Sequence, residues 1–329
     1  MIRIRKASLL DYSDIWQVHA SDIDQWVDSQ GQVDLATFRQ TSMAERWLKG
    51  GPWMSPETCA IHLNALLLAG QTPLVAARGA RILGEIELFL GEDASFGGLS
   101  LNISVLYAHR SARGQGVGSA LLNETIRRAK VFGCRAVSVY SPSPDAERLY
   151  RRVGLQEEYE QSMLTLPTSL LAKATESCLQ PVDWPETYQP LSNLDLWVGS
   201  YQSGIQCWQQ LLWALEPGLY ALPLKPITKQ MVLAADTPAS GKAYLCLRPL
   251  GNGEQAQAYI WSESPDLNLV AAALAWAGRL GIRQLQLMCG LDIAAKLHHR
   301  FGGEIEPGHK RLALRLSSGN QGPNTQGRS

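Results

Sequence analysis

Apolar residues along the chain recur with periods that separate strands from helices. Ile2 and Ile4 alternate with arginines, which predicts a half-buried edge strand at the start of the chain. Ser55 and Pro56 open a helical pattern, because serine caps a helix and proline suits its first turn. The same patterns predict helices at residues 8–19, 55–68 and 144–153, and strands at residues 73–77, 82–90, 103–108, 135–140 and 163–166, the last of which closes the sheet.

A glycine-rich loop separates one of these strands from the helix that follows it. The loop is residues 113–118, Arg-Gly-Gln-Gly-Val-Gly, and apolar residues recur at helical spacing from Ala120 to Ala129. The start of a helix presents free backbone N–H groups and the positive end of the helix dipole. Glycine lets the backbone approach a bulky anion because it has no Cβ. An isolated Gly-x-Gly would indicate only a tight turn, but this context predicts a site for an anion such as a diphosphate.

Two common nucleotide-binding loops do not match this stretch. No Lys-Ser or Lys-Thr follows the glycines, as a P-loop requires, and a G-x-G-x-x-G pattern with an acidic residue about 20 positions later is absent. The spacing of Arg113, Gly116 and Gly118 instead resembles the R/Q-x-x-G-x-G/A signature of the GNAT superfamily of N-acetyltransferases. The second signature of that family, N-x-x-A-x-x-L-Y-x-x-x-G-F, resembles Ser143, Ala146, Leu149, Tyr150, Gly154 and Leu155.

This resemblance implies a fold, an activity and a set of site residues for the first half of the chain. The implied fold is α/β (α+β), with a mixed, mostly antiparallel sheet flanked by helices. The implied activity is transfer of an acetyl group from the co-substrate acetyl-CoA to a primary amine, by direct attack of the amine on the thioester. By position, the pantetheine arm would pair with the backbone of Leu106, Tyr107 and Ala108 and meet Ser143, and the diphosphate would lie on Arg113, Gly114, Gln115, Gly116, Val117, Gly118 and Ser119.

The same resemblance makes Tyr150 the general acid that protonates the leaving thiolate. An unperturbed tyrosine has a pKa of about 10 and is therefore protonated at neutral pH. The glutamate that some family members use as general base has Asn102 in its place here, and asparagine cannot take a proton. Three alternatives stay open for this step: Glu85 acting through water, Glu87 acting through water, or an amine that arrives already deprotonated.

The second half of the chain repeats part of the first at a distance of 148 residues. This register places Gly154 on Gly302 and Tyr150 on His298, and it carries the glycine loop onto residues 261–266, which hold two carboxylates and no glycine. Because carboxylates repel a diphosphate, we expect a degenerate GNAT-like domain without an acyl-CoA site, in tandem with the intact one. The predicted organisation is a GNAT domain at residues 1–166, a linker at 167–190, a degenerate GNAT-like domain at 191–316 with a helix at 205–215, and a disordered tail at 317–329.

Composition limits the remaining function classes. The chain has 30 Lys and Arg and 30 Asp and Glu, and this balance predicts no attraction to nucleic acid or to an anionic membrane. No apolar run reaches the roughly 20 residues that span a bilayer. The start lacks the apolar core of a signal peptide, and six scattered cysteines predict a reduced, cytoplasmic protein without a metal site.

The expected partner is a small-molecule or peptide amine acceptor, and the oligomeric state stays open. The rival hypothesis is a non-catalytic acyl-CoA-binding or sensory protein, in which the second lobe binds a partner.

Overall fold

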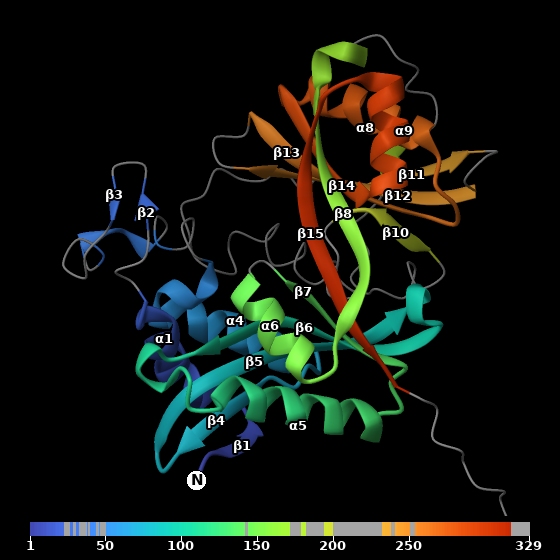
Figure 1. Ribbon diagram of the computed structural model, residues 1–329. Helices are drawn as coiled ribbons and strands as arrows, with labels where there is room; N and C mark the ends of the chain where they lie inside the picture. Colours follow the sequence, from blue (N-terminus) through green and yellow to red (C-terminus); the bar gives the residue numbers. More distant parts are fainter. Residues whose placement is uncertain are drawn as a thin grey trace, which may run out of the picture.

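In the part of the chain that the computed structural model describes, a mostly antiparallel sheet of 13 strands runs through both halves of this mixed α/β protein (Figure 1). The sheet order is β1-β4-β5-β6-β7-β15-β8-β14-β13-β12-β11-β9, and β10 pairs with β13 beside this path. The structure describes residues 1–22, 27–28, 31–32, 38, 40–43, 46, 51–141, 144–171, 179–181, 194–199, 232–237, 241–250 and 254–316.

The first half of the molecule comprises residues 1–155. Among the described strands of the main sheet in this half, β6 and β7 run parallel and the other neighbouring pairs are antiparallel. Its strands are β1 (Arg3–Lys6), β4 (Leu74–Arg78), β5 (Arg81–Asp93), β6 (Gly98–Ala108) and β7 (Ala136–Ser141), with a separate small sheet of β2 (Val27–Asp28) and β3 (Gly31–Gln32). Its helices are α1 (Tyr12–Ala20), α4 (Pro56–Leu68), α5 (Val117–Val131) and α6 (Pro144–Arg152), and its short 3-10 turns are η1 (Leu9–Asp11), η3 (Pro52–Met54), η4 (Ala94–Phe96) and η5 (Arg110–Ala112).

Helices cover both faces of this part of the sheet, because alternate strand residues point to opposite faces. On one face, Ile15 and Val18 of α1 and Leu63 of α4 form a core with Val75 of β4. On the other face, α5 and α6 pack over a core that includes the fully buried Leu121. The predicted helix start at Ser55 is confirmed, since its side chain accepts a hydrogen bond from the backbone of α4.

The second half comprises the described residues 194–303, with β9 at its far edge. The strands β13 and β14 are parallel here, as β6 and β7 are in the first half. The fully buried Trp261 lies in the core, and Ala294 and Leu297 pack α9 against the sheet. The elements are β9 (Leu179–Pro181), β10 (Asp195–Val198), β11 (Val232–Thr237), β12 (Gly241–Leu250), β13 (Gln255–Ser262), β14 (Gln284–Gly290), α8 (Leu267–Arg279), α9 (Leu291–Phe301) and the turn η6 (Thr168–Leu171) before β9.

Two long strands join the halves, and each ends in the half opposite to the one where it begins (Figure 1). The strand β8 (Gln156–Pro167) follows α6, and its residues 161–167 pair with β14. The strand β15 (Glu304–Arg315) follows α9, and its residues 310–315 pair with β7. The two strands also pair with each other. Each half therefore completes its sheet with a strand from the other half.

Buried charge fixes the end of β15 against the first half. Arg311 is 4% exposed, and its guanidinium pairs with Asp93 at the end of β5. The same guanidinium donates to Ser95 Oγ at 2.8 Å and lies 4.3 Å from the centre of the Phe96 ring. These contacts link residues more than 200 positions apart in the sequence.

The strand exchange corrects the predicted place of residues 163–166, and the starts of three later elements follow the 148-residue repeat. Residues 163–166 do form a strand, but the prediction that they close the first sheet is wrong, because they pair with β14 while β15 takes the place beside β7. The elements β14, α9 and β15 begin within one residue of the positions 148 after β7, α6 and β8. The predicted helix at 205–215, most of the predicted linker and the predicted tail lie outside the described residues.

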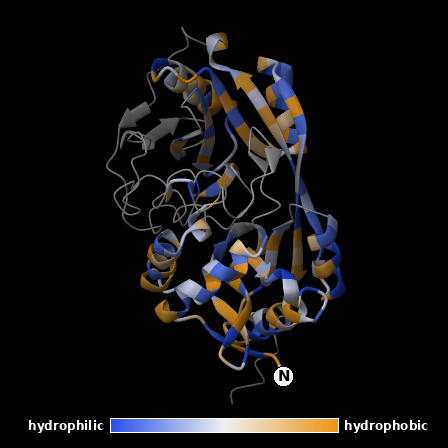
Figure 2. Ribbon diagram, turned by 90° about the vertical axis from the view of Figure 1, so that its left-hand side faces the viewer, coloured by the Kyte–Doolittle hydropathy of each residue, from blue (hydrophilic) through white to orange (hydrophobic). Residues whose placement is uncertain are grey.

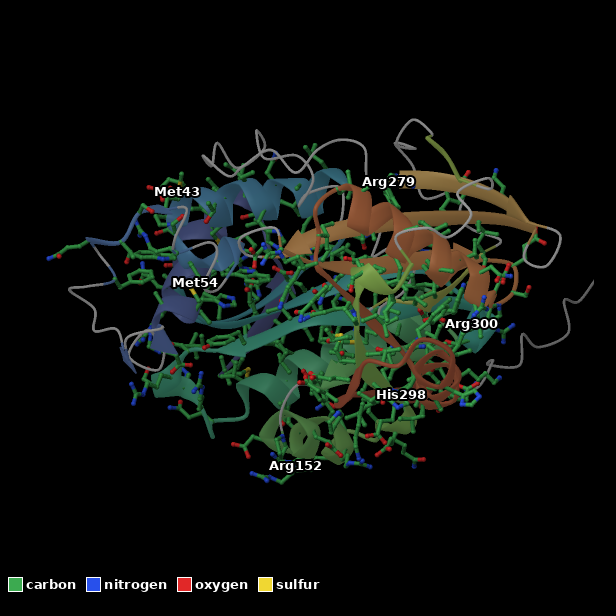
Figure 3. All side chains as sticks on the ribbon, turned by 90° about the horizontal axis from the view of Figure 1, so that it is seen from above. Met43, Met54, Arg152, Arg279, His298 and Arg300 are labelled. Atoms are coloured by element: carbon green, nitrogen blue, oxygen red, sulfur yellow. The ribbon has the colours of Figure 1, made fainter. Side chains whose placement is uncertain are left out.

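Apolar residues, coloured orange in Figure 2, lie among the strands and helices of both halves. Exposed charges lie on the outer sides of the helices: Figure 3 shows Arg152 of α6 and its counterpart Arg300 of α9 with His298. The cysteines in the described part of the chain, Cys59, Cys134, Cys246 and Cys289, are buried and form no disulfide with one another. None of the described helices is long and apolar enough to cross a membrane.

Candidate functional site

The two parallel strands of the first half separate toward one end and leave an open edge. The pairing of β6 with β7 runs from Ser100 opposite Ala136 to Ile103 opposite Val139. A bulge follows at Ser104, where the register between β5 and β6 shifts, and β6 continues to residue 108. Bulges bend a strand and increase its twist, so β6 turns away from β7 at this point.

The backbone of Leu106 and Ala108 faces this open edge. The N–H of His109 donates to Leu83 O of β5 at 2.8 Å, and alternate residues of a strand present their N–H and C=O groups to opposite sides. Tyr107, two positions before His109, therefore faces β5, whereas Leu106 and Ala108 face away from it. An extended ligand in the opening could add to β6 like another strand through these two residues.

The glycine loop ends at the start of α5, beside the open edge. Gly116 has φ 82° and is the N-cap of α5 without a side-chain cap. The first helical hydrogen bond of α5 runs from Ala120 N to Gly116 O at 2.9 Å. The N–H groups of the three residues between them, Val117 to Ser119, consequently have no acceptor within the helix. Three adjacent donors at the positive end of a helix dipole suit a diphosphate.

Gly84 of β5 and the last glycine of the loop, Gly118, let the helices and strands around the loop pack closely. A Cβ on Gly84 of β5 would lie 2.7 Å from both Tyr107 O and Val117 Cγ1. A Cβ on Gly118 would lie 2.9 Å from Leu149 Cδ2 of α6. Because real Cβ atoms do not approach this closely, glycine at these positions brings the start of α5 against β5 and against α6.

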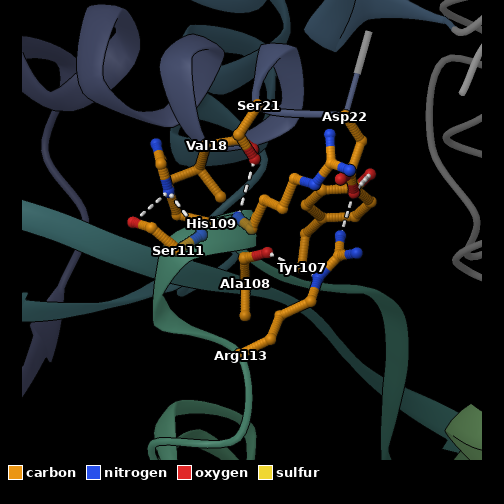
Figure 4. Close-up of polar contacts among 9 residues, drawn as sticks. Val18, Ser21, Asp22, Tyr107, Ala108, His109, Ser111 and Arg113 are labelled. Carbon is orange, nitrogen blue, oxygen red and sulfur yellow. Dashed lines mark hydrogen bonds and ion pairs between the residues drawn. The ribbon is translucent and has the colours of Figure 1, made fainter. Parts of the chain in front are cut away.

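The Arg113 side chain turns away from the loop and toward the end of α1 (Figure 4). Its guanidinium pairs with the buried carboxylate of Asp22, donates through Nε to Ala108 O at 3.3 Å and lies 5.5 Å from the centre of the Tyr107 ring. The Tyr107 hydroxyl donates to the same carboxylate at 2.6 Å. Burial, followed by this hydrogen bond, raises the pKa of Tyr107 to about 12.

Two arginines that the motif does not contain stand beside the loop. Arg78 Nη2 at the end of β4 donates to Gln115 Oε1 at 3.1 Å, and Arg81 Nη2 lies 3.3 Å from His109 Nε2. Burial, followed by the charge of Arg81, lowers the pKa of His109. Both arginines are exposed and flank the turn between β4 and β5. They add positive charge to a site suited to phosphate groups, and no sequence signal linked them to the loop because they lie more than 25 residues before it.

Tyr150 lies on α6, which packs against the start of α5 through Leu149. Its side chain is 5% exposed, and burial raises the pKa of the phenol, which keeps it protonated at neutral pH. Its hydroxyl forms no hydrogen bond with any residue that the structure describes, so it can donate to a ligand. Ser143, the predicted pantetheine contact at the start of this motif, lies outside the described residues.

Asn102, which stands where some family members have a glutamate, has a structural contact. Its Nδ2 donates to Ser138 Oγ of β7 at 2.8 Å, and its side chain is 1% exposed. The amide therefore ties β6 to β7 just before the two strands separate. In the part of the chain that the structure describes, no group of three or more His, Cys, Asp or Glu side chains could hold a metal ion.

The corresponding opening of the second half is occupied by the chain itself. The pairing of β13 with β14 ends at Gln257 opposite Gln286, yet β13 continues to Ser262. The strand β10 pairs antiparallel with this continuation. Beyond β10, Gly199 N donates to Met288 O of β14 at 2.7 Å, so this segment bridges both sides of the opening.

A side chain of the protein likewise occupies the corresponding helix start of the second half. Asp266 is the N-cap of α8, and its carboxylate accepts a hydrogen bond from Asn268 N at 2.9 Å. A side-chain carboxylate thus lies where the uncapped helix start of the first half leaves N–H groups for an anion. His298, at the position that corresponds to Tyr150, is exposed.

Comparison with known proteins agrees with this geometry. Residues 34–155 match the family model described as Acetyltransferase (GNAT) family. The sequence matches no curated protein. A GCN5-related N-acetyltransferase from Kribbella flavida has a similar structure, with a TM-score of 0.54, 12% identity, and coverage of 96% of this chain and 72% of its own.

A GCN5-related N-acetyltransferase from Anabaena variabilis gives a TM-score of 0.53 at 13% identity, over 95% of this chain and 72% of its own. A probable N-acyltransferase from Enterococcus faecalis gives a TM-score of 0.50 at 12% identity, over 96% of this chain and 73% of its own. At these identities the likeness concerns the fold, which is shared over nearly the whole chain.

Proposed function

We propose that residues 34–155, which match the GNAT family model, act as an acetyltransferase domain that moves an acetyl group from acetyl-CoA to a primary amine by direct attack. The observation that carries the proposal is the uncapped start of α5 beside the open edge of β6. A diphosphate at the start of α5 and an extended pantetheine arm along the open edge of β6 would place the thioester between β6 and α6. The acceptor is a small-molecule or peptide amine.

Each residue of the site has a role in this proposal. The N–H groups of Val117, Gly118 and Ser119 hold the diphosphate, and Arg78 and Arg81 add attraction for the phosphates. The backbone of Leu106 and Ala108 holds the pantetheine arm. Tyr150 gives its hydroxyl proton to the sulfur as the carbon–sulfur bond breaks, which contributes about 10²–10⁴-fold in such reactions.

A protein that binds acyl-CoA without turnover is the alternative, and a thiol-release assay separates the two. Acetyl-CoA is incubated with phenethylamine, spermidine, glucosamine or a lysine peptide, and free thiol is measured. We expect amine-dependent release with at least one acceptor and its loss in Tyr150→Phe. Tight binding of acetyl-CoA without release with any amine class would favour the alternative.

We further propose a tandem arrangement, in which the second half is a degenerate GNAT-like domain without an acyl-CoA site. The repeat at 148 residues supports the shared ancestry of the two halves. The segment that begins with β10 lies where a pantetheine arm would add to β13, and Asp266 lies where a diphosphate would meet α8. The second half then supports the first through the exchanged strands and does not bind a second co-substrate.

A further inference from the structure

Two buried pairs of imidazole and carboxylate lie in the first half, on the face of the main sheet that α1 and α4 cover. His19 Nε2 of α1 contacts Glu85 Oε1 of β5 in a short hydrogen bond. His62 Nε2 of α4 lies 3.0 Å from Glu87 Oε1, which also accepts from Trp53 Nε1 at 2.7 Å. Glu85 is 1% exposed and Glu87 is 2% exposed. Burial of a carboxyl group is costly unless the group is hydrogen-bonded. The two imidazoles supply such hydrogen bonds, and the burial of two carboxyl groups on one face suggests a function.

Only the first pair borders the open edge of β6. The rings of His19 and Tyr107 stack at 4.4 Å between centroids, and Trp53 stacks on His19 at 5.4 Å. Glu85 lies directly opposite Tyr107 in the register of β5 with β6. His19 is thus one ring away from the strand segment whose backbone would hold the thioester. The pair formed by His62 and Glu87 lies farther along β5.

The contact with Glu85 orients His19 as a carboxylate orients the imidazole of a general base. It holds Nε2, while Nδ1 forms no hydrogen bond with any described residue. Burial, followed by the charge of Glu87, raises the pKa of Glu85 well above its usual range, and burial lowers the pKa of His19. Both shifts favour the uncharged forms, so the pair gains stability when a proton neutralises its single negative charge.

On the basis of the proposed acetyl transfer, we propose that His19 and Glu85 together accept the proton that the acceptor amine loses. As the amine nitrogen bonds to the thioester carbon, its proton goes to His19 Nδ1, directly or across one water molecule. The proton on Nε2 passes at the same time to Glu85, so no imidazolium forms in the buried site. The carbon–sulfur bond then breaks, and the sulfur takes the proton of Tyr150. Solvent later removes the proton from the pair and returns one to Tyr150.

The surrounding groups set the pH above which this pair can accept a proton. The pair must be in its singly negative form, so kcat/KM rises as the pH rises through its titration. The thiol of Cys59 and the phenol of Tyr107 both have raised pKa values and stay neutral. The titratable and charged groups around the pair are Asp22 just after α1, Cys59 and His62 of α4, Glu87 of β5, Tyr107 of β6 and Arg113 before α5.

Glu85→Gln and Glu87→Gln form a matched pair of variants for the test. Each replaces one buried carboxyl by an amide of the same shape, and urea unfolding and acetyl-CoA binding verify that each variant is folded. The rate of thiol release is measured from about pH 5.5 to 9.5 with the best amine acceptor of the panel. Glu85→Gln should lower kcat/KM on the plateau about 100-fold or more and remove the rising limb. Glu87→Gln should keep the limb and move it to lower pH, because the like charge that raises the pKa of Glu85 is gone.

A spectroscopic readout does not depend on turnover. In protein labelled with ¹⁵N-histidine, His19 should change from the Nε2–H to the Nδ1–H tautomer as the pH falls, without becoming an imidazolium. Glu85→Gln should abolish this change. A His19 that keeps one tautomer, or an active enzyme whose pH limb survives Glu85→Gln, would overturn this inference alone. Acetyl-CoA binding without thiol release by any amine would instead overturn the proposed function, and the proton transfer with it.

Discussion

Replacing Arg311 by methionine should destabilise the protein strongly, although the residue belongs to a strand near the end of the described chain. The guanidinium is 4% exposed and satisfies the carboxylate of Asp93, which is itself largely buried. Methionine keeps the aliphatic part of the side chain but leaves that carboxylate without its cation. Removing one partner of a buried ion pair costs about 3–5 kcal/mol, and the lost contact with the Phe96 ring adds to this cost.

Urea unfolding followed by tryptophan fluorescence measures this loss as a shift of the midpoint. Lys310→Met is the matched control, because the neighbouring Lys310 pairs with Glu157 at 3.0 Å on the surface and its loss should leave stability close to that of the wild type. The double variant Asp93→Asn, Arg311→Met should recover part of the loss, since it leaves no unpaired charge. If Arg311→Met were no less stable than Lys310→Met, the exchanged strand would not be held as described.

Three further predictions concern the first half. Gly118→Val should cost about 1–3 kcal/mol and slow thiol release, because a Cβ already comes within 2.9 Å of Leu149 and pushes α6 away; denaturation and kinetics measure both effects. Tyr150→Phe should lower kcat about 10²–10⁴-fold with the Kd for acetyl-CoA unchanged, and an unaltered kcat with chemistry rate-limiting would remove the phenol from the mechanism. The hydrogen bond from Arg127 lowers the pKa of Glu124 to about 2, so this carboxylate stabilises the fold above its unfolded pKa of about 4.3 and loses that effect as the pH falls toward 2. Glu124→Gln should consequently lower the melting temperature at pH 6 and have a much smaller effect at pH 2.

Local patterns in the sequence were sufficient to predict the glycine loop and the helix start on which the proposed anion site depends. The loop before α5 needs glycine at a left-handed φ and a helix start without a side-chain cap, and both requirements are visible in the sequence around Gly116. The repeat at 148 residues likewise predicted where β14 and α9 begin. These features depend on neighbours in the chain, and their physical causes act over a few residues.

The features that depend on distant partners could not be read from the sequence. The pattern at residues 163–166 predicts a strand, but alternation does not say which strand lies beside it, and the partner turned out to be β14. The contact of His19 with Glu85 joins residues 66 positions apart. A partial signal existed, since His19 follows Ile15 by four positions and so lies on the inner face of α1. The place of β10 beside β13 carried no such signal.

Isothermal titration calorimetry on the full chain, which measures the stoichiometry of acetyl-CoA binding, tests directly whether only the first half holds an acyl-CoA site. We expect one site per chain, and Gly116→Asp, which puts a carboxylate at the start of α5, should remove the heat of binding. Asp266→Ala, the change at the corresponding helix start of the second half, should leave the single site intact. Two sites per chain, no binding by the wild type, or unchanged binding by Gly116→Asp would contradict this expectation.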